Sequence, residues 1–135
     1  MKASGKILLV DDDPDFLDMH KAVLQNHGYD VLTATSGQEG LERVRAEMPD
    51  LIILDLMMEK HDAGFSFTKT VKTDPLFRKI PILMVTSVAG VTGFRFSLEE
   101  DGYWMKTDDF LDKPVMPEVL LERVDKLLSK REEGQ

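Results

Sequence analysis

The sequence predicts an α/β protein: a doubly wound, five-stranded parallel sheet with helices on both faces. Short apolar segments alternate along the chain with segments whose apolar residues recur at helical spacing. Three of the short segments are apolar at every position, as expected of parallel strands that helices cover on both sides. This alternation of strand and helix patterns is typical of the α/β class.

Five short apolar segments are the predicted strands. Each is rich in β-branched, aliphatic or aromatic residues, and turn-forming or acidic residues bound it. Glycine, proline and capping residues separate these segments from the helices that connect them. The predicted strands cover residues 7–10, 29–34, 51–54, 80–85 and 110–112.

Capping and stop signals bound the predicted helices. Pro14 suits the first turn of the first helix, and Gly28 marks its end. Ser36 to Glu39 form a capping-box pattern before the second helix, which Pro49 ends. The third helix is expected over 65–73, a fourth within 88–109 and a last one from Pro117.

The length and composition favour one globular domain. The chain has 135 residues, of which 42% are hydrophobic, so a single domain over 1–135 is expected, with its core at about 6–130 and a frayed tail at 131–135. The net charge of −8 disfavours binding to nucleic acid or to an anionic membrane. There is no cysteine, and the apolar run after Lys6 is too short for a signal peptide or a membrane span. We therefore expect a cytoplasmic protein.

Polar residues with chemical potential follow four of the predicted strands. The first strand is followed by Asp11 and Asp12, the third by Asp55, the fourth by Thr86 and the fifth by Lys113. The carboxyl ends of parallel strands meet at one edge of the sheet, where α/β proteins bind their ligands. The sequence thus predicts carboxylates, a hydroxyl and an amine at one edge.

Four segments resemble the signature segments of receiver domains of two-component response regulators. Any one of them is a weak signal, but the four occur in the right order, each at a predicted strand end. They are Val10-Asp11-Asp12-Asp13-Pro14, Leu54-Asp55-Leu56-Met57-Met58, Met84-Val85-Thr86-Ser87 and Asp112-Lys113-Pro114. The resemblance spans roughly 6–130. It implies a flavodoxin-like, CheY-like fold and a signalling domain that catalyses only its own phosphorylation and dephosphorylation.

The resemblance implies that Asp55 is the phosphoacceptor. Its carboxylate would attack the phosphorus of a phosphodonor and form an acyl phosphate. A cation is needed between two anionic reactants, and Mg²⁺, with Mn²⁺ as the alternative, suits carboxylate ligands. The implied metal ligands are Asp11, Asp12, Asp55 and the backbone carbonyl of Met57.

The resemblance also implies a phosphoryl-binding pair and a switch. Lys113 would pair with the phosphoryl group as a compact charge, and the hydroxyl of Thr86 would donate to a phosphoryl oxygen. When Thr86 moves toward the phosphoryl group, Phe110 would fill the space behind it.

The implied partners follow from these roles. A histidine kinase or phosphotransfer protein would supply the phosphoryl group. A downstream protein would bind the surface of the fourth helix, fifth strand and last helix, and the chain would be a monomer or weak homodimer.

The sequence departs from the family at two places. Glu59 stands where the family usually has proline, four positions after the phosphoacceptor. The segment 88–109 is longer than usual and rich in aromatic residues, and Lys106-Thr107 replace a common Gly-Ala pair.

Two alternative functions stay open from the sequence. A degenerate receiver would act as a phosphorylation-independent binding module. A phosphatase of the haloacid-dehalogenase type would use Asp11 as nucleophile and Asp13 as acid/base. Against the phosphatase, Asp15 stands where its signature wants Thr or Val, and Asp55 would have no role.

Overall fold

A computed structural model describes residues 5–55, 63–86, 109–112 and 115–133 of the chain. Strands and helices alternate along these residues. The strands are β1 (Lys6–Val10), β2 (Asp30–Ala34), β3 (Leu51–Asp55), β4 (Ile82–Thr86) and β5 (Asp109–Asp112); the helices are α1 (Pro14–Asn26), α2 (Gly37–Glu47), α3 (Ala63–Thr73) and α5 (Pro117–Glu133). Among the described residues, no helix has the length and apolar character that crossing a membrane requires.

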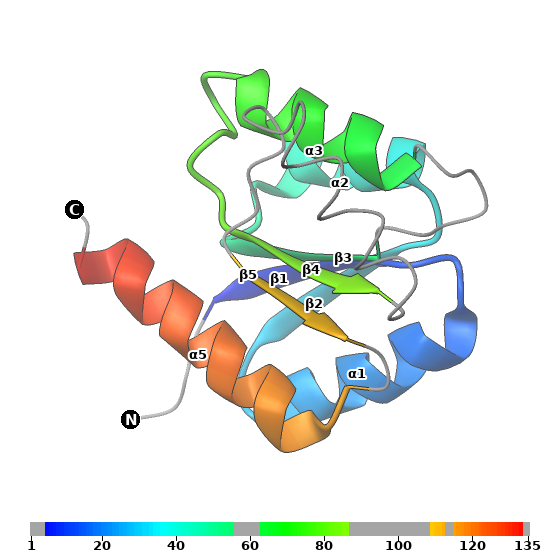
Figure 1. The fold of residues 1–135 in the computed structure, drawn as a ribbon, viewed down its shortest axis with the longest axis vertical. Helices are drawn as coiled ribbons and strands as arrows, with labels where there is room; N and C mark the ends of the chain where they lie inside the picture. The colour runs from blue at the N-terminus through cyan, green and yellow to red at the C-terminus, as the bar shows by residue number, and fades with distance from the viewer. Residues whose placement is uncertain (1–4, 56–62, 87–108, 113–114, 134–135) are drawn as a thin grey trace.

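The strands form one parallel sheet in the order β2-β1-β3-β4-β5 (Figure 1). The last residue of β1, Val10, pairs with Ala34 of β2 and with Leu54 of β3. The strands therefore end close together at one edge. The order of strands reverses between β1 and β3, which is where ligand sites form in doubly wound sheets. The predicted fold class is confirmed.

Helices cover both faces of the sheet. Figure 1 shows α2 and α3 on one face and α1 and α5 on the other. Because side chains alternate along a strand, Leu8 and Val10 join the core under α2 and α3, whereas Ile7 and Leu9 join the core under α1 and α5. All four side chains are buried. This double coverage explains why the strands read as continuous apolar runs.

β1 and β5 each begin one residue before the predicted start, whereas β2 and β4 begin later than predicted because backbone groups are used elsewhere. β2 begins at Asp30, one residue late, since the N–H of Tyr29 donates to the carbonyl of Leu24 at the end of α1. β4 begins at Ile82, two residues late, since the N–H of Ile80 donates to Phe77 within the preceding turn. Pattern alone cannot reveal these bonds.

The helix boundaries agree with the capping signals except at three ends. The capping-box prediction is confirmed by the Ser36 Oγ, which accepts from the N–H of Glu39 at 3.1 Å. The Glu39 carboxylate accepts from the N–H of Thr35 at 2.6 Å, and this hydrogen bond lowers the pKa of Glu39. The helix α2 ends at Glu47, before Pro49, because Met48 adopts a left-handed backbone with φ of 48°.

The other two differences are extensions. α3 begins at Ala63, two residues earlier than predicted. α5 continues to Glu133, into the segment expected to be a frayed tail. Its last residues are Lys, Arg and Glu, which favour helix.

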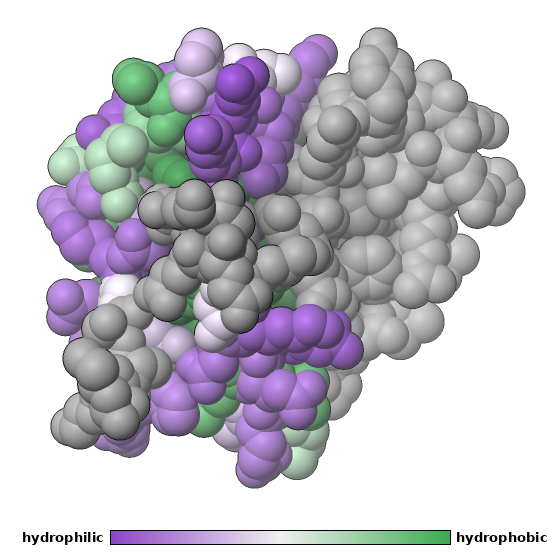
Figure 2. Space-filling view, turned by 90° about the vertical axis from the view of Figure 1, so that its left-hand side faces the viewer, coloured by the Kyte–Doolittle hydropathy of each residue, from purple (hydrophilic) through white to green (hydrophobic). Residues whose placement is uncertain are grey.

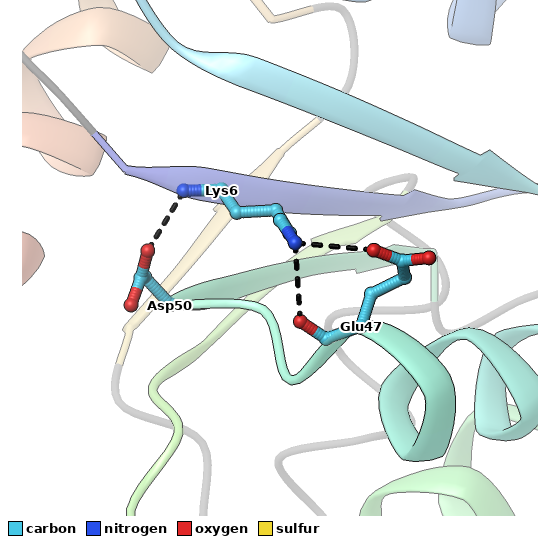
Figure 3. Close-up of polar contacts among 3 residues, drawn as sticks. All are labelled: Lys6, Glu47 and Asp50. Atoms are coloured by element: carbon cyan, nitrogen blue, oxygen red, sulfur yellow. Dashed lines mark hydrogen bonds and ion pairs between the residues drawn. The ribbon is translucent and has the colours of Figure 1, made fainter.

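A polar cluster joins the start of β1 to the loop before β3 (Figure 3). The N–H of Lys6 donates to Asp50 Oδ2 at 2.8 Å, and the N–H of Asp50 donates back to the carbonyl of Lys6 at 2.7 Å. The Lys6 ammonium reaches Glu47 Oε1 at 3.1 Å and the Glu47 carbonyl at 3.3 Å. Asp50 thus extends the β1–β3 pairing by one residue and fixes where both strands begin.

We predict that Asp50→Ala lowers the free energy of unfolding by about 1–2 kcal/mol, because it leaves the partly buried Lys6 N–H without its acceptor. The matched control Glu47→Ala removes only a half-exposed ion pair and should cost less than about 1 kcal/mol. Urea denaturation of both variants measures the difference. Equal losses of unfolding free energy in the two variants would show that the hydrogen bond from the Lys6 N–H to Asp50 contributes no more to stability than the ion pair.

Gly40 allows α2 to approach the sheet and α3 closely. A Cβ at this position would lie 2.8 Å from Cε2 of Phe67 on α3 and 3.1 Å from Cγ2 of Val10 on β1. The first distance is shorter than a van der Waals contact, so the Phe67 ring would have to move. Phe67 is fully buried. The close approach of α2 to α3 therefore depends on the absence of a side chain at Gly40.

We predict that Gly40→Ala destabilises the protein by about 1–3 kcal/mol through overpacking, although alanine is the better helix former by about 1 kcal/mol. In a Phe67→Leu background, which lacks the clashing ring atom, the same substitution should become neutral or stabilising. Thermal unfolding of the four proteins in this double-mutant cycle tests the interpretation. A loss of the same size in both backgrounds would exclude a clash with Phe67.

Candidate functional site

Asp11 directly follows the last residue of β1, at the edge of the sheet where the parallel strands end. Its N–H donates to the carbonyl of Ala34 at 3.1 Å, which prolongs the β1–β2 pairing. Its carboxylate oxygen Oδ1 accepts from the N–H of Asp13 at 2.9 Å. Asp11 is only 1% exposed, so both its backbone and its side chain are held in place.

Asp13 has a structural role that the sequence analysis missed. Its side chain accepts from the N–H of Asp15 at 3.0 Å and caps α1, whose first residue is Pro14. The signal was present, since an aspartate before a proline is a common helix start. The cap makes α1 begin directly after Asp13. Asp12, which lies between Asp11 and Asp13 in the sequence, is exposed.

Asp55 ends β3 at the same edge. It pairs with Val85 of β4, and the preceding residue Leu54 pairs with Val10, which precedes Asp11. The Asp55 side chain is 6% exposed. Asp55 and Asp11 are therefore adjacent strand-end carboxylates on neighbouring parallel strands.

The structure brings three of the predicted site residues together. Carboxylate oxygens of Asp11, Asp12 and Asp55 all lie within 4.8 Å of one another. Burying carboxylates of like charge so closely is unfavourable unless a cation or hydrogen bonds compensate. A donor set of carboxylate oxygens is the kind that Mg²⁺ prefers. These residues therefore fit a small divalent cation.

Thr86 and Phe110 are placed by their strands. Thr86 is the last residue of β4, one position beyond Val85, the partner of Asp55. Phe110 lies in β5 opposite Met84. Both strands thus lead to the edge that carries the carboxylates, as predicted.

Other predicted features lie outside the described residues. Among the site residues these are Lys113 and Met57, although Lys113 directly follows Asp112, which pairs with Thr86. The departures at Glu59 and at 88–108, with the predicted fourth helix, also fall outside them.

Comparison with known proteins agrees with this arrangement. The family model described as response regulator receiver domain matches residues 7–125. Protein PilH of Pseudomonas aeruginosa is 33% identical over 128 residues, which are 93% of this chain and 98% of PilH. The alkaline phosphatase synthesis transcriptional regulatory protein PhoP of Bacillus subtilis is 35% identical over 94% of this chain.

Solved structures show the same fold. A CheY-like response regulator receiver domain protein of Methanospirillum hungatei superposes with a TM-score of 0.84 at 29% identity, covering 98% of this chain and all of the other.

The chain spans about half the length of several of its curated relatives, including 50% of PhoP. The match therefore concerns one domain of those longer proteins.

Proposed function

Since the chain belongs to the response regulator receiver family, we propose that it accepts a phosphoryl group on Asp55 within a two-component phosphorelay. The observation that carries the proposal is the cluster of Asp11, Asp12 and Asp55, with carboxylate oxygens within 4.8 Å of one another at the carboxyl edge of the sheet. The phosphoryl donor is a histidine kinase or phosphotransfer protein, and the reaction takes place in the cytoplasm.

In the proposed reaction a carboxylate oxygen of Asp55 attacks the phosphorus of a phosphohistidine. The P–N bond breaks, the imidazole leaves, and an acyl phosphate forms on Asp55. Bound Mg²⁺, or Mn²⁺, supplies positive charge that lowers the repulsion between the two anions. Asp11, Asp12 and Asp55 would hold the cation, together with the backbone carbonyl of Met57.

Fixed geometry supports these roles. The hydrogen bond from the Asp13 N–H holds the Asp11 carboxylate at 2.9 Å, so this ligand loses little freedom when a cation binds. Asp55 is 6% exposed at the end of β3, so its carboxylate is held by the packing of the strand. Lys113 pairs with the phosphoryl oxygens, and Thr86 donates its hydroxyl to one of them.

The proposed switch uses β4 and β5. Thr86 moves toward the phosphoryl group, and Phe110 fills the space that it leaves. The parallel pairing of Thr86 with Asp112 and of Met84 with Phe110 supports this coupling, because it makes the two strands direct neighbours in the sheet. A downstream protein binds the surface of the fourth helix, β5 and α5.

The alternative phosphatase is less well supported. Its nucleophile would be Asp11, whose carboxylate already accepts from the N–H of Asp13. Asp55 is a strand-end carboxylate of the same cluster, and the phosphatase gives it no task. The main alternative function is that of a phosphorylation-independent binding module. Detection of a phosphorylated product would exclude it.

We predict that incubation with Mg²⁺ and acetyl phosphate adds one phosphoryl group, seen as one mass increment by intact-protein mass spectrometry. The adduct should be absent with chelator and in an Asp55→Asn variant. No adduct on the folded parent protein would favour the binding module. An adduct that persists in Asp55→Asn and disappears in Asp11→Asn would favour the phosphatase.

We predict that Mg²⁺ raises the melting temperature of the parent protein as its concentration increases, because it binds the folded state alone. Asp11→Asn keeps an oxygen that can accept from Asp13 but removes one of the clustered charges. This variant should be more stable than the parent without metal, on the order of 1 kcal/mol, and insensitive to Mg²⁺. Thermal unfolding at several Mg²⁺ concentrations measures both effects. An equal response of parent and variant would exclude Asp11 as a ligand.

A further inference from the structure

The segment between α3 and β4 carries the most exposed large hydrophobic residue among the described residues. We name residues 74–80 the α3–β4 turn. Leu76 in this turn is 73% exposed, whereas Phe77 and Ile80 are buried beneath it. A single exposed leucine is common on protein surfaces, so exposure alone assigns no role. Its surroundings distinguish this one.

The α3–β4 turn is held rigidly. The Asp74 side chain accepts from the N–H of Leu76 at 2.8 Å, and the Asp74 carbonyl accepts from the N–H groups of Phe77 and Arg78 at 3.1 and 2.9 Å. The Lys72 ammonium donates to the carbonyl of Ile80 at 2.8 Å. Leu76 is therefore presented on a preorganised backbone, and binding a partner there would cost little ordering entropy.

Basic side chains surround Leu76. Residues 69–80 contain four basic side chains and one acidic one, although the whole chain has a net charge of −8. Arg78 and Lys79 are exposed in the turn itself, and Lys72 lies over the turn through its bond to Ile80. Lys69 is one helical turn before Lys72 on the same side of α3. The apolar side chain thus has a positively charged border.

This surface lies away from the carboxylate cluster. In Figure 1 the α3–β4 turn lies at the end of the sheet where the strands begin, and Figure 2 faces that side, with hydrophobic surface near its top beside strongly hydrophilic surface. Since β3 and β4 are parallel strands of five residues, the turn and Asp55 lie at opposite ends, about 13 Å apart or more.

We propose that the α3–β4 turn is a docking surface for an acidic protein segment whose apolar side chains contact Leu76 and whose carboxylates pair with the exposed Arg78 and Lys79. An apolar centre with a charged border is the usual composition of a protein interface. A short acidic segment would contact the basic border alone, whereas nucleic acid and anionic lipid are extended and would also face the acidic remainder of the chain, which repels them.

The test uses the full chain labelled with ¹⁵N and titrated with a synthetic peptide in which glutamates alternate with leucines. We expect amide shifts concentrated in residues 69–80. Binding should be at least tenfold weaker for Arg78→Glu/Lys79→Glu and several-fold weaker for Leu76→Ser. Raising the salt concentration should weaken binding further, since it screens exposed charges. Addition of Mg²⁺ and acetyl phosphate should leave the affinity unchanged, which makes the result independent of the chemistry proposed for Asp55.

The control variant is Lys21→Glu/Lys126→Glu, which changes the net charge equally on α1 and α5, across the sheet from α3. It should bind the peptide like the parent protein. The proposal is overturned if the shifts lie outside 69–80, if the control loses as much affinity as Arg78→Glu/Lys79→Glu, or if Leu76→Ser binds unchanged. It is also overturned if a polyuridine oligonucleotide or phosphatidylserine vesicles shift residues 69–80 and the peptide does not.

Discussion

The parallel pairing of β1 and β3 is the constraint on which the site depends. Val10 pairs with Leu54, so the next residues along each strand, Asp11 and Asp55, leave the sheet side by side. The strands are apolar and buried on both faces, and their side chains pack into the two cores beneath the helices. The carboxylates are thus brought together by the pairing and packing of two apolar strands.

Packing energy holds together groups that electrostatics would separate. Asp11 and Asp55 are nearly buried, and Asp12 joins them within 4.8 Å. The Asp13 N–H and the cap on α1 reduce the freedom of this edge, so the carboxylates stay close without a covalent restraint. A cation bound among these carboxylates would offset their negative charge.

The sequence predicted the fold and the carboxylate cluster because both depend on local pattern. An apolar run that ends in aspartate indicates both a buried strand and the carboxylate at its end, as at Leu54-Asp55. The failures come from non-local bonds. Tyr29 leaves the predicted strand because its N–H bonds to α1 and its hydroxyl donates to Asp125 of α5. The exposure of Leu76 could not be predicted, because the turn is anchored by Phe77 and Ile80 in the core.

The two ends of the sheet differ in what a phosphoryl group would change. A phosphoryl group adds about −1.5 to −2 charges at neutral pH, and charges at the surface are screened over about 8 Å at physiological ionic strength. The α3–β4 turn lies beyond that range from Asp55, whereas β5 is joined to the site by the pairing of Thr86 with Asp112. Under the two proposals, a partner bound at β5 and α5 would sense phosphorylation through backbone contacts. A partner bound at Leu76 would not, so the same domain could be held at one end and switched at the other.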